Sequence, residues 1–495
     1  MFSRADNLLS SLSPLLCWRL FWLIGFLLCT LAFGFHFFSD NFSYAYRVRE
    51  MPIPTLVFGL FLTGFLFVFL RFLLPRLVKF EENAVFSLRF LTVSPLCAIF
   101  VIGLIARALL LFSEPVLEDD YHRYLWDGGV LAHGVSPYTY SPTDILEGED
   151  TPMLLKELSS WASPVPERIN HPDLRTIYPA GAQALFSVSH FFGPWSLTAW
   201  RIMILMAELT TFALLLSMLN LIARSPLWIS LYWWNPLVIK ELMNSAHMEA
   251  VMLPFLLGGV YLAMRGFFAK SSLLLSLAAS IKFWPALLLP LVWQPLIKRP
   301  LILVISIVIS LCIGGVIVWP FLQSGLNESS GLVAYGVQWK TNSAFFPTFE
   351  SLILFFTDLV SLPQKNGALL ARALVGLFLV GLVFWLAFAQ IKGDKKHERL
   401  TLFSFSVVSF ALFLLSPAQF PWYFVWVAPF LVFYPLWGFV VLMPFMAFYY
   451  LGFYFNTVDE IRDYKFLLSF LIWLPVWGLL AYELLNHRRR LLAPV

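Results

Sequence analysis

The residues with the clearest chemical potential lie in the stretch LEDDYHRYLWDGGVLAHGVSPYTYSP, residues 117–142. Two adjacent carboxylates, Asp119 and Asp120, come soon after the apolar run 93–112. A carboxylate at the boundary between water and lipid could accept a proton from a hydroxyl, or hold a divalent cation against a phosphate. Acidic residues are also common at solvated loop ends, which is the ordinary structural explanation for either aspartate alone. The interleaved aromatic residues favour a binding site, because aromatic rings together with a few polar groups commonly hold a ligand.

The stretch therefore supplies both kinds of candidate residue. The expected catalytic residues are Asp119 and Asp120, and the expected substrate-binding residues are Tyr121, Arg123, Tyr124, Trp126 and Asp127. Asp127 precedes Gly128 and Gly129, so it could equally mark a turn or a helix end. If the protein depends on a metal ion, Asp119 and Asp120 would be the ligands, and magnesium or manganese the ion.

Five later residues complete the candidate site. His247 and Glu249 lie in NSAHMEA, and ionisable residues at membrane depth are costly and usually functional. Lys282, in SIKFWP, would be expensive in lipid unless it meets an anion, and a lipid phosphate is the natural partner. Lys340, in QWKTNSAFFP, and Trp422, in SPAQFPWYFVWVAP, could contact sugar or phosphate. Each also has an ordinary explanation: a hydrogen-bonded histidine, a lysine reaching the interface, a short polar loop or an aromatic belt.

The composition indicates a protein that crosses the membrane many times. Of its 495 residues, 60% are hydrophobic and 13% are charged, whereas soluble proteins have about 25% charged residues. Apolar runs of about 17–25 residues recur, and each is long enough to cross a hydrocarbon core of about 30 Å. The first, 18–38, is too long for the hydrophobic region of a cleavable signal peptide. The four cysteines lie in or beside apolar runs, so neither a disulfide framework nor a zinc site is expected.

The apolar runs predict an all-α bundle of about 12 full spans. Their expected bounds are 18–38, 54–75, 90–112, 197–222, 226–243, 248–265, 300–321, 367–391, 399–415, 418–434, 436–455 and 464–486. The run 271–295 is interrupted by IKFWP, which predicts a broken re-entrant hairpin folded at 282–285. The amphipathic run 178–193 is expected to lie on the outer surface; in the alternative threading, both runs cross the membrane once.

Basic clusters decide between the two threadings. RLVK (76–79), KGDKKHER (392–399) and HRRR (487–490) should be cytoplasmic, because positive charge is concentrated on that side. The preferred threading also places Arg224, Arg265 and Lys270 inside. The large loops 113–196 and 322–366, together with 244–250, then face outward and converge on one side of the membrane.

Several segments together resemble the GT-C glycosyltransferases, above all the bacterial family-87-like and polyprenol-phosphate-mannose-dependent mannosyltransferases. EDDYHRYLWDG…GVSPY resembles their first outer loop, and IYPAGAQALF resembles their YPP surface helix, with Ala180 in place of the second proline. WNPLVIKELMNSAHMEA resembles their NP…E…GHND segment, from which Ser245, Ala246 and Glu249 depart. IKFWPALLLP and PWYFVWVAP also resemble later segments, so the likeness covers roughly residues 90–440.

The resemblance implies a membrane hexosyltransferase in the inner or plasma membrane, with its active site on the extracytoplasmic face. It implies an inverting transfer of a hexose, with mannose favoured, from a polyprenyl-phosphate sugar to a lipid or glycan acceptor. Asp119 or Asp120 would deprotonate the acceptor, and Lys282 would meet the phosphate. The catalytic core would be 90–440, preceded by a two-span segment, 1–89, and followed by spans and a basic cytoplasmic tail in 441–495. The expected partners are donor, acceptor and membrane lipids, without nucleic acid.

Two other classes of protein remain alternatives. A secondary transporter or a flippase for lipid-linked glycans would need a pathway to both sides, whereas these candidate residues are expected at one face, and no internal repeat is evident. A polysaccharide polymerase or ligase also carries a large outer loop, but usually later in the chain. The sequence does not identify the acceptor.

Overall fold

The computed structural model is all-α and describes residues 13–83, 94–361, 363–389, 397–457 and 464–486. The basic cluster 487–490 and most of the cluster 392–399 lie outside these residues. The described chain divides into two compact units that alternate along the sequence. Unit 1 comprises 1–117, 215–244 and 420–495, and unit 2 comprises 118–214 and 245–419.

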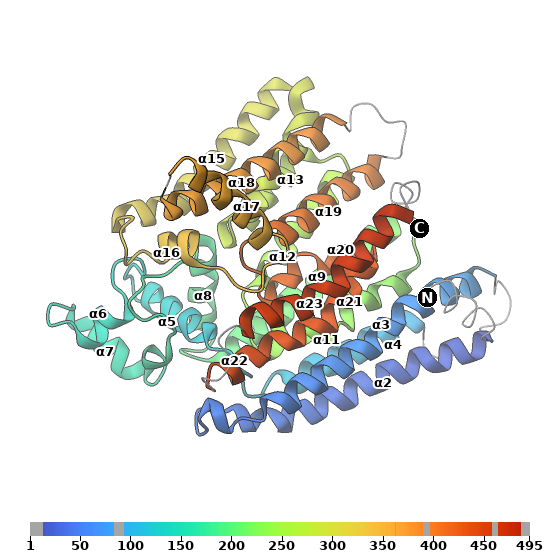
Figure 1. Ribbon diagram of the computed structural model, residues 1–495, viewed down its shortest axis with the longest axis horizontal. Helices are drawn as coiled ribbons and strands as arrows, with labels where there is room; N and C mark the ends of the chain where they lie inside the picture. The colour runs from blue at the N-terminus through green and yellow to red at the C-terminus, as the bar shows by residue number, and fades with distance from the viewer. Residues whose placement is uncertain (1–12, 84–93, 362, 390–396, 458–463, 487–495) are drawn as a thin grey trace. The chain divides into compact units, whose positions relative to one another are not determined.

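Unit 1 is built on long apolar helices that pack side by side. α2 (Pro14–Phe38) contacts α3 (Ile53–Asn83) and α4 (Pro95–Leu110), while α21 (Trp437–Phe445) packs between α3 and α23 (Tyr464–Asn486) (Figure 1). Shorter elements are α10 (Ser230–Trp233), α11 (Pro236–Ile239), the π-helix Lys240–Asn244, α20 (Ala428–Leu431) and α22 (Leu451–Phe455). Prolines 226, 236, 421 and 429 each lie within the first two residues of a short element, which explains why these apolar runs do not continue as single helices.

Unit 2 combines short helices between α4 and α9 with a second group of apolar helices. The short helices are α5 (Asp120–Ala132), α6 (Pro142–Glu147), α7 (Met153–Ala162) and α8 (Ala180–Phe192). The remaining helices are α9 (Leu197–Leu221, which continues into unit 1), α12 (Glu249–Met264), α13 (Phe268–Ile281), α14 (Leu289–Trp293), α15 (Pro300–Ser324), α16 (Gly331–Gln338), α17 (Phe346–Leu359), α18 (Gln364–Ala389) and α19 (His397–Leu415). α8 packs on both α5 and α13.

Eight helices among the described residues are long and apolar enough to cross a membrane, so the expected count of twelve spans is not confirmed. They are Pro14–Phe42, Ile53–Phe80, Leu197–Leu221, Pro300–Ser324, Asn366–Ala389, His397–Leu415, Trp437–Phe455 and Tyr464–Asn486. Of the other four expected spans, 90–112 and 248–265 correspond to the 16-residue helices α4 and α12. The runs 226–243 and 418–434 are divided into the short elements described above.

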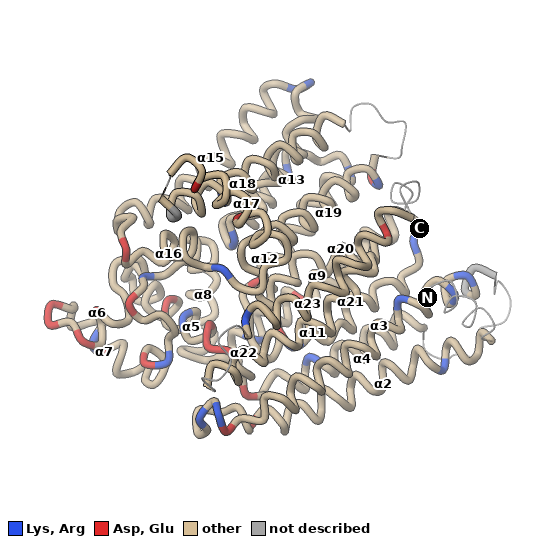
Figure 2. The backbone as a smooth tube through the Cα atoms, viewed as in Figure 1, with Lys and Arg blue, Asp and Glu red and all other residues tan. Residues whose placement is uncertain are grey.

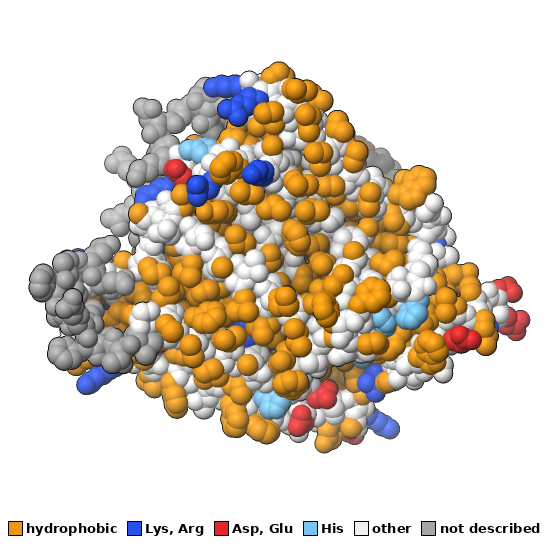
Figure 3. All heavy atoms as spheres, turned by 180° about the vertical axis from the view of Figure 1, so that it is seen from behind, with side chains coloured by type: hydrophobic (Ala, Val, Ile, Leu, Met, Phe, Trp, Pro, Cys, Tyr) orange, Lys and Arg blue, Asp and Glu red, His pale blue; other side chains and the backbone are white. Residues whose placement is uncertain are grey.

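The surface of the apolar helices suits a membrane. α15 carries no charged residue, and Figure 2 shows its tube without charge along its length. Its side chains Leu301, Leu311 and Val316 are each more than 60% exposed. Hydrophobic side chains also cover much of the face shown in Figure 3. Exposed apolar surface on this scale is expected where lipid is the solvent.

The predicted break at 282–285 is present. α13 ends at Ile281, Lys282 is extended with φ −143° and ψ 130°, and the next element begins at Trp284. The run 178–193, predicted to be amphipathic, forms the 13-residue helix α8. The break places Lys282 at the end of α13 rather than within a helix.

Candidate functional site

The candidate site begins where the chain enters α5. Asp119 is the N-cap residue and Asp120 the first residue of this helix. The Oε1 of Glu118 accepts hydrogen bonds from the backbone N–H groups of Asp119, at 3.2 Å, and Asp120, at 3.1 Å. These N–H groups have no intrahelical partner, so a carboxylate beside them is stabilised by both hydrogen bonding and the helix dipole. Three consecutive carboxylates are therefore gathered at one helix N-terminus.

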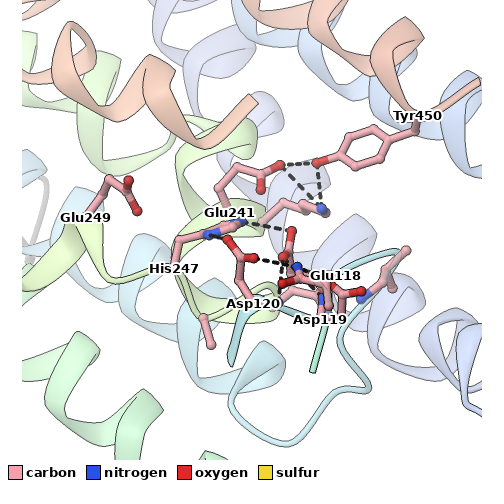
Figure 4. A network of polar contacts seen from close by, with 12 residues as sticks. Glu118, Asp119, Asp120, Glu241, His247, Glu249 and Tyr450 are labelled. Carbon is pink, nitrogen blue, oxygen red and sulfur yellow. Dashed lines mark hydrogen bonds and ion pairs between the residues drawn. The ribbon is translucent and has the colours of Figure 1, made fainter. Parts of the chain in front are cut away.

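Two side chains distant in sequence hold these carboxylates together (Figure 4). The Nδ2 of Asn170 donates to the Oδ1 of Asp119, at 2.7 Å, and to the Oδ1 of Asp120, at 2.8 Å. The Nε2 of His247 lies 2.9 Å from the Oε2 of Glu118, and its Nδ1 lies 4.0 Å from the Oδ2 of Asp120. His247 is fully buried. The structure thus brings His247 to the aspartates, as the sequence predicted.

The environment of the two aspartates makes them better bases than free aspartate. Burial, reinforced by the neighbouring carboxylates of Glu118 and Asp120, raises the pKa of Asp119 to about 7. Burial and Glu118 also raise the pKa of Asp120 to about 6, although His247 and Asn170 act in the opposite direction. A general base is most effective when its pKa lies near the operating pH, so both groups are suited to accepting a proton near neutral pH.

Unusual backbone conformations flank the site residues. Leu117, Ala246 and His171 have positive φ angles of 54°, 60° and 47°. Each is adjacent in sequence to a member of the cluster, namely Glu118, His247 or Asn170. Positive φ is uncommon outside glycine and is often maintained at functional sites by the surrounding structure.

Unit 1 holds together the two chain segments that lead to Glu118 and His247. The Oδ1 of Asn244 accepts from the backbone N–H of Val116, and its Nδ2 donates to the Oγ of Ser113 and the carbonyl of Glu114. Asn244 is the last residue of the π-helix, a form that occurs frequently at functional sites. Asn244 and the segment 113–116 are thereby fixed to each other.

Arg123, expected to bind substrate, instead supports the segment that carries Asn170. It is 7% exposed, and its Nη2 donates to the carbonyls of Asn170, at 3.4 Å, and His171, at 3.3 Å. A buried guanidinium on two consecutive carbonyls restricts the backbone beside Asn170. In the described structure Arg123 therefore fixes the conformation of this backbone segment.

The aromatic residues of α5, expected to hold a sugar, are packed in the interior of unit 2. Tyr121, Tyr124 and Trp126 are only 6%, 2% and 3% exposed. Tyr124 stacks on Phe186 of α8 with ring centroids 4.8 Å apart, and Trp126 stacks on Trp195. Sugar binding by these residues stays a prediction, and in the described structure α5 turns their rings away from solvent and onto other aromatic rings.

Asp127 and the following glycines also belong to the packing of α5. The Oδ2 of Asp127 accepts from the Nε2 of Gln183 on α8, at 2.8 Å, and burial raises the pKa of Asp127. A Cβ on Gly128 would lie 2.5 Å from the backbone of Phe186, and a Cβ on Gly129 would lie 2.0 Å from the ring of Trp195. The glycines allow close packing inside a helix, rather than marking a turn or a helix end, and Asp127 is a buried hydrogen-bonding partner.

The two lysines expected to contact phosphate or sugar, Lys282 and Lys340, each form an ion pair. The Nζ of Lys282 lies 2.7 Å from the Oε1 of Glu249, which joins two of the predicted site residues. Glu249 is 1% exposed, whereas the side chain of Lys282 is 19% exposed. Lys340 pairs with Glu350 and remains exposed. Lys282 is thus not the lone cation that the sequence suggested.

Trp422 lies in unit 1, where its ring stacks on that of Phe420. Unit 1 also contains a buried polar network, in which the Nζ of Lys240 contacts the hydroxyl of Tyr450 at 2.6 Å and the Oε1 of Glu241 at 3.3 Å (Figure 4). The Tyr450 hydroxyl also donates to Glu241. The network satisfies buried charges on the π-helix, and none of its members was among the predicted site residues.

One group among the described residues has the geometry to hold a metal ion. Glu118, Asp120 and His247 each offer a ligand atom, and these atoms all lie within 4.8 Å of one another. Carboxylate oxygens and an imidazole nitrogen suit several divalent metals. The group includes Asp120, one of the two expected ligands, but not Asp119.

Sequence reasoning missed two members of the cluster. Glu118 stands beside Asp119 in EDD, so its proximity could have been recognised. Asn170 lies in the loop before α8, 51 residues from Asp119, and no motif identified it. Only the fold shows that its amide bridges both aspartates.

Comparison of the sequence with known proteins identifies the family of this chain. Residues 45–297, more than half of the chain, match the family profile described as Alpha-(1->6)-mannopyranosyltransferase, N-terminal domain. Alpha-(1->6)-mannopyranosyltransferase A of Mycobacterium tuberculosis (strain ATCC 25618 / H37Rv) is 25% identical over 359 residues. That alignment covers 66% of this chain and 63% of the relative, so the chain spans less than two thirds of the relative's length. No solved structure matches the chain. The chain belongs to the MptA_B family of alpha-(1->6)-mannopyranosyltransferases, which confirms the likeness to polyprenyl-phosphate-mannose-dependent GT-C enzymes.

Proposed function

We propose that the protein transfers a mannosyl residue from a polyprenyl-phosphate donor to a hydroxyl of a glycan or lipid-linked acceptor, with inversion at the anomeric carbon. The observation that carries the proposal is the bridging of Asp119 and Asp120 by one amide of Asn170. This arrangement holds two carboxylates of raised pKa side by side at the N-terminus of α5.

The proposed reaction is a single displacement. The acceptor oxygen attacks the anomeric carbon of mannose while one aspartate removes its proton, and the bond from that carbon to the phosphate oxygen breaks. The electron pair of this bond leaves with the polyprenyl phosphate. Asp120 is the favoured base, because Asn170 holds its Oδ1 and its Oδ2 faces the Nδ1 of His247.

Lys282 is the proposed cation for the leaving phosphate. An ammonium group has three N–H donors, so it can retain Glu249 while donating to a phosphate oxygen. Its side chain is partly exposed, and it lies at the end of α13, beyond the last helical turn. Positive charge at this place would stabilise the negative charge that develops on the leaving group.

The acceptor and the location complete the proposal. The name of the family and of the M. tuberculosis relative specifies an α-(1→6) linkage, so the favoured acceptor group is the O6 hydroxyl of a hexose. The eight candidate spans and the expected orientation of the basic clusters support a site on the extracytoplasmic face of the plasma membrane.

The test uses the purified full-length protein in lipid nanodiscs. It is supplied with polyprenyl-phosphate mannose labelled in the sugar and with a short α-mannan acceptor. The expected product is acceptor extended by one labelled mannose, and methylation analysis should place the new linkage at O6. Intact protein that uses only a nucleotide sugar, or that transfers to no hexose acceptor, would overturn the proposal.

A further inference from the structure

Three aromatic side chains in unit 2 contact one another and are at least partly exposed, and one of them, His171, directly follows Asn170 in the chain. The ring of His171, which is exposed, lies 5.0 Å from that of Trp339, and the ring of Trp339 lies 5.6 Å from that of Tyr335. Trp339 and Tyr335 are partly exposed, unlike the buried rings of α5. These three residues are called the aromatic platform below.

The two ends of the aromatic platform are related to different parts of the candidate site. At one end, His171 directly follows Asn170, whose amide holds both aspartates. At the other end, Tyr335 is among the groups that raise the pKa of Lys282, after the larger effect of Glu249. Trp339 contacts both of the other rings, so it lies between them.

Two arginines hold the platform in place before any ligand arrives. Arg123 donates to the carbonyls of Asn170 and His171. Arg372 donates in the same way to the carbonyls of Val337, at 3.1 Å, and Trp339, at 3.2 Å. Groups fixed in advance lose little conformational entropy on binding, so they contribute more of their contact energy to affinity.

We propose that the aromatic platform binds the hexopyranose that is being transferred, with Trp339 as its principal contact. The inference rests on the proposed function. In a displacement with inversion, the transferred sugar lies between the base and the leaving phosphate. His171, at one end of the platform, follows the Asn170 that holds the proposed base, and Tyr335, at the other end, acts electrostatically on Lys282. An aromatic ring offers a large apolar face to the C–H groups of a sugar, while nearby polar groups bind its hydroxyls.

The test measures the contribution of the sugar separately from that of the lipid phosphate. The melting temperature of the full-length protein is measured in two samples, one with bound polyprenyl-phosphate mannose and one with bound polyprenyl phosphate. The parent should be stabilised more by the mannosyl lipid. Trp339→Ala should lose this difference, and its KM for the donor should rise about tenfold, while its KM for the acceptor stays unchanged.

Two further variants keep the result interpretable. Trp339→Phe retains a ring and should keep the donor KM within about threefold of the parent. Trp161→Ala removes a tryptophan that is 66% exposed on α7 and should match the parent in every measurement. If Trp339→Ala does not fold, His171→Ala is the replacement, and it should reduce the sugar-dependent stabilisation.

The outcomes separate the two proposals. A parent protein that transfers mannose, combined with a Trp339→Ala variant that keeps the sugar-dependent stabilisation, overturns the platform alone. A rise confined to the acceptor KM also overturns it, since the platform would then hold the acceptor. A parent that neither transfers mannose nor distinguishes the two lipids refutes the proposed function itself.

Discussion

The Nζ of Lys282 lies 2.7 Å from the Oε1 of Glu249, so residues 33 positions apart form one ion pair. Glu249 begins α12, and Lys282 follows the last residue of α13. The pair therefore joins two packed helices. It also leaves the side chain of Lys282 partly exposed, while Glu249 is buried. Structural and functional roles for Lys282 have to be separated by experiment.

Lys282→Ala should destabilise the protein by about 3–5 kcal/mol, because it leaves Glu249 buried without its counter-charge. Adding Glu249→Gln should restore much of the stability, since the uncompensated charge is then removed. The double variant should still have a raised KM for the polyprenyl-phosphate donor. Thermal unfolding and donor kinetics on the same preparations check both effects. A stable double variant with the parent's donor KM would limit Lys282 to its structural role.

Asp119→Asn and Asp120→Asn should each yield a folded protein, and at least one should abolish measurable transfer. Removing a positioned base costs on the order of 10²–10⁴-fold in rate. Asp120→Asn is expected to have the larger effect, because Asp120 is held by Asn170 and faces His247. Turnover with polyprenyl-phosphate mannose is measured beside a melting curve. Two folded variants with the parent rate would contradict the catalytic assignment.

The transfer rate should increase with pH through about 6–7, because the base must be ionised and the pKa values of Asp119 and Asp120 are raised to about 7 and about 6. A rate that is flat across this range, under conditions where chemistry limits turnover, would count against either aspartate as the base. Whichever single Asn variant retains activity provides the comparison.

Stability should change with pH in the opposite direction. A carboxyl group whose pKa is higher in the folded protein than in the unfolded chain contributes stability that is fully present below about pH 4 and is lost as the pH rises through 6–7. The parent should therefore lose more of its free energy of unfolding between about pH 5 and pH 8 than Asp119→Asn does. Melting temperatures across this range provide the measurement, and equal losses would argue against the raised pKa of Asp119.

Arg123→Gln should lower turnover more than it raises the KM for either substrate, because Arg123 positions the Asn170–His171 backbone and is itself buried. Loss of a hydrogen bond to a charged group costs about 1.5–3 kcal/mol, so some loss of stability is also expected. Kinetics at a temperature where the variant remains folded separate the two effects. A large increase in the donor KM alone would indicate direct contact with the substrate.

A cysteine at position 147 should react with a membrane-impermeant reagent in intact spheroplasts, since residues 113–176 are expected outside the cytoplasm. Glu147 is exposed at the end of α6. The background replaces the native cysteines Cys17, Cys29, Cys97 and Cys312. Lys298→Cys is the matched control, because Lys298 is exposed and the threading that places the basic clusters inside also places the segment IKRP, residues 297–300, on the cytoplasmic side. It should react only after lysis, and the reverse pattern would invert the topology.

The sequence by itself determined the membrane character, the family likeness and the position of the acidic residues. Long apolar runs can satisfy their backbone hydrogen bonds in lipid only as helices, so composition alone predicts an all-α protein. The break at Lys282 was also predictable, because Pro285 cannot continue a helix. The expected count of twelve spans was not confirmed among the described residues, because apolar runs such as 226–243 and 418–434 contain prolines and fold as short elements.

Only the tertiary structure decided which residues meet at the site. Asn170 and the Glu118–His247 pair depend on contacts across 50 to more than 100 residues, which local sequence patterns do not encode. Tyr124 and Trp126 were expected to hold sugar because they lie near aspartates in the sequence. The sequence does not reveal whether such a ring faces solvent or the core. Packing against Phe186 of α8 and against Trp195 buries the rings of Tyr124 and Trp126, while the distant Trp339 stays partly exposed beside His171.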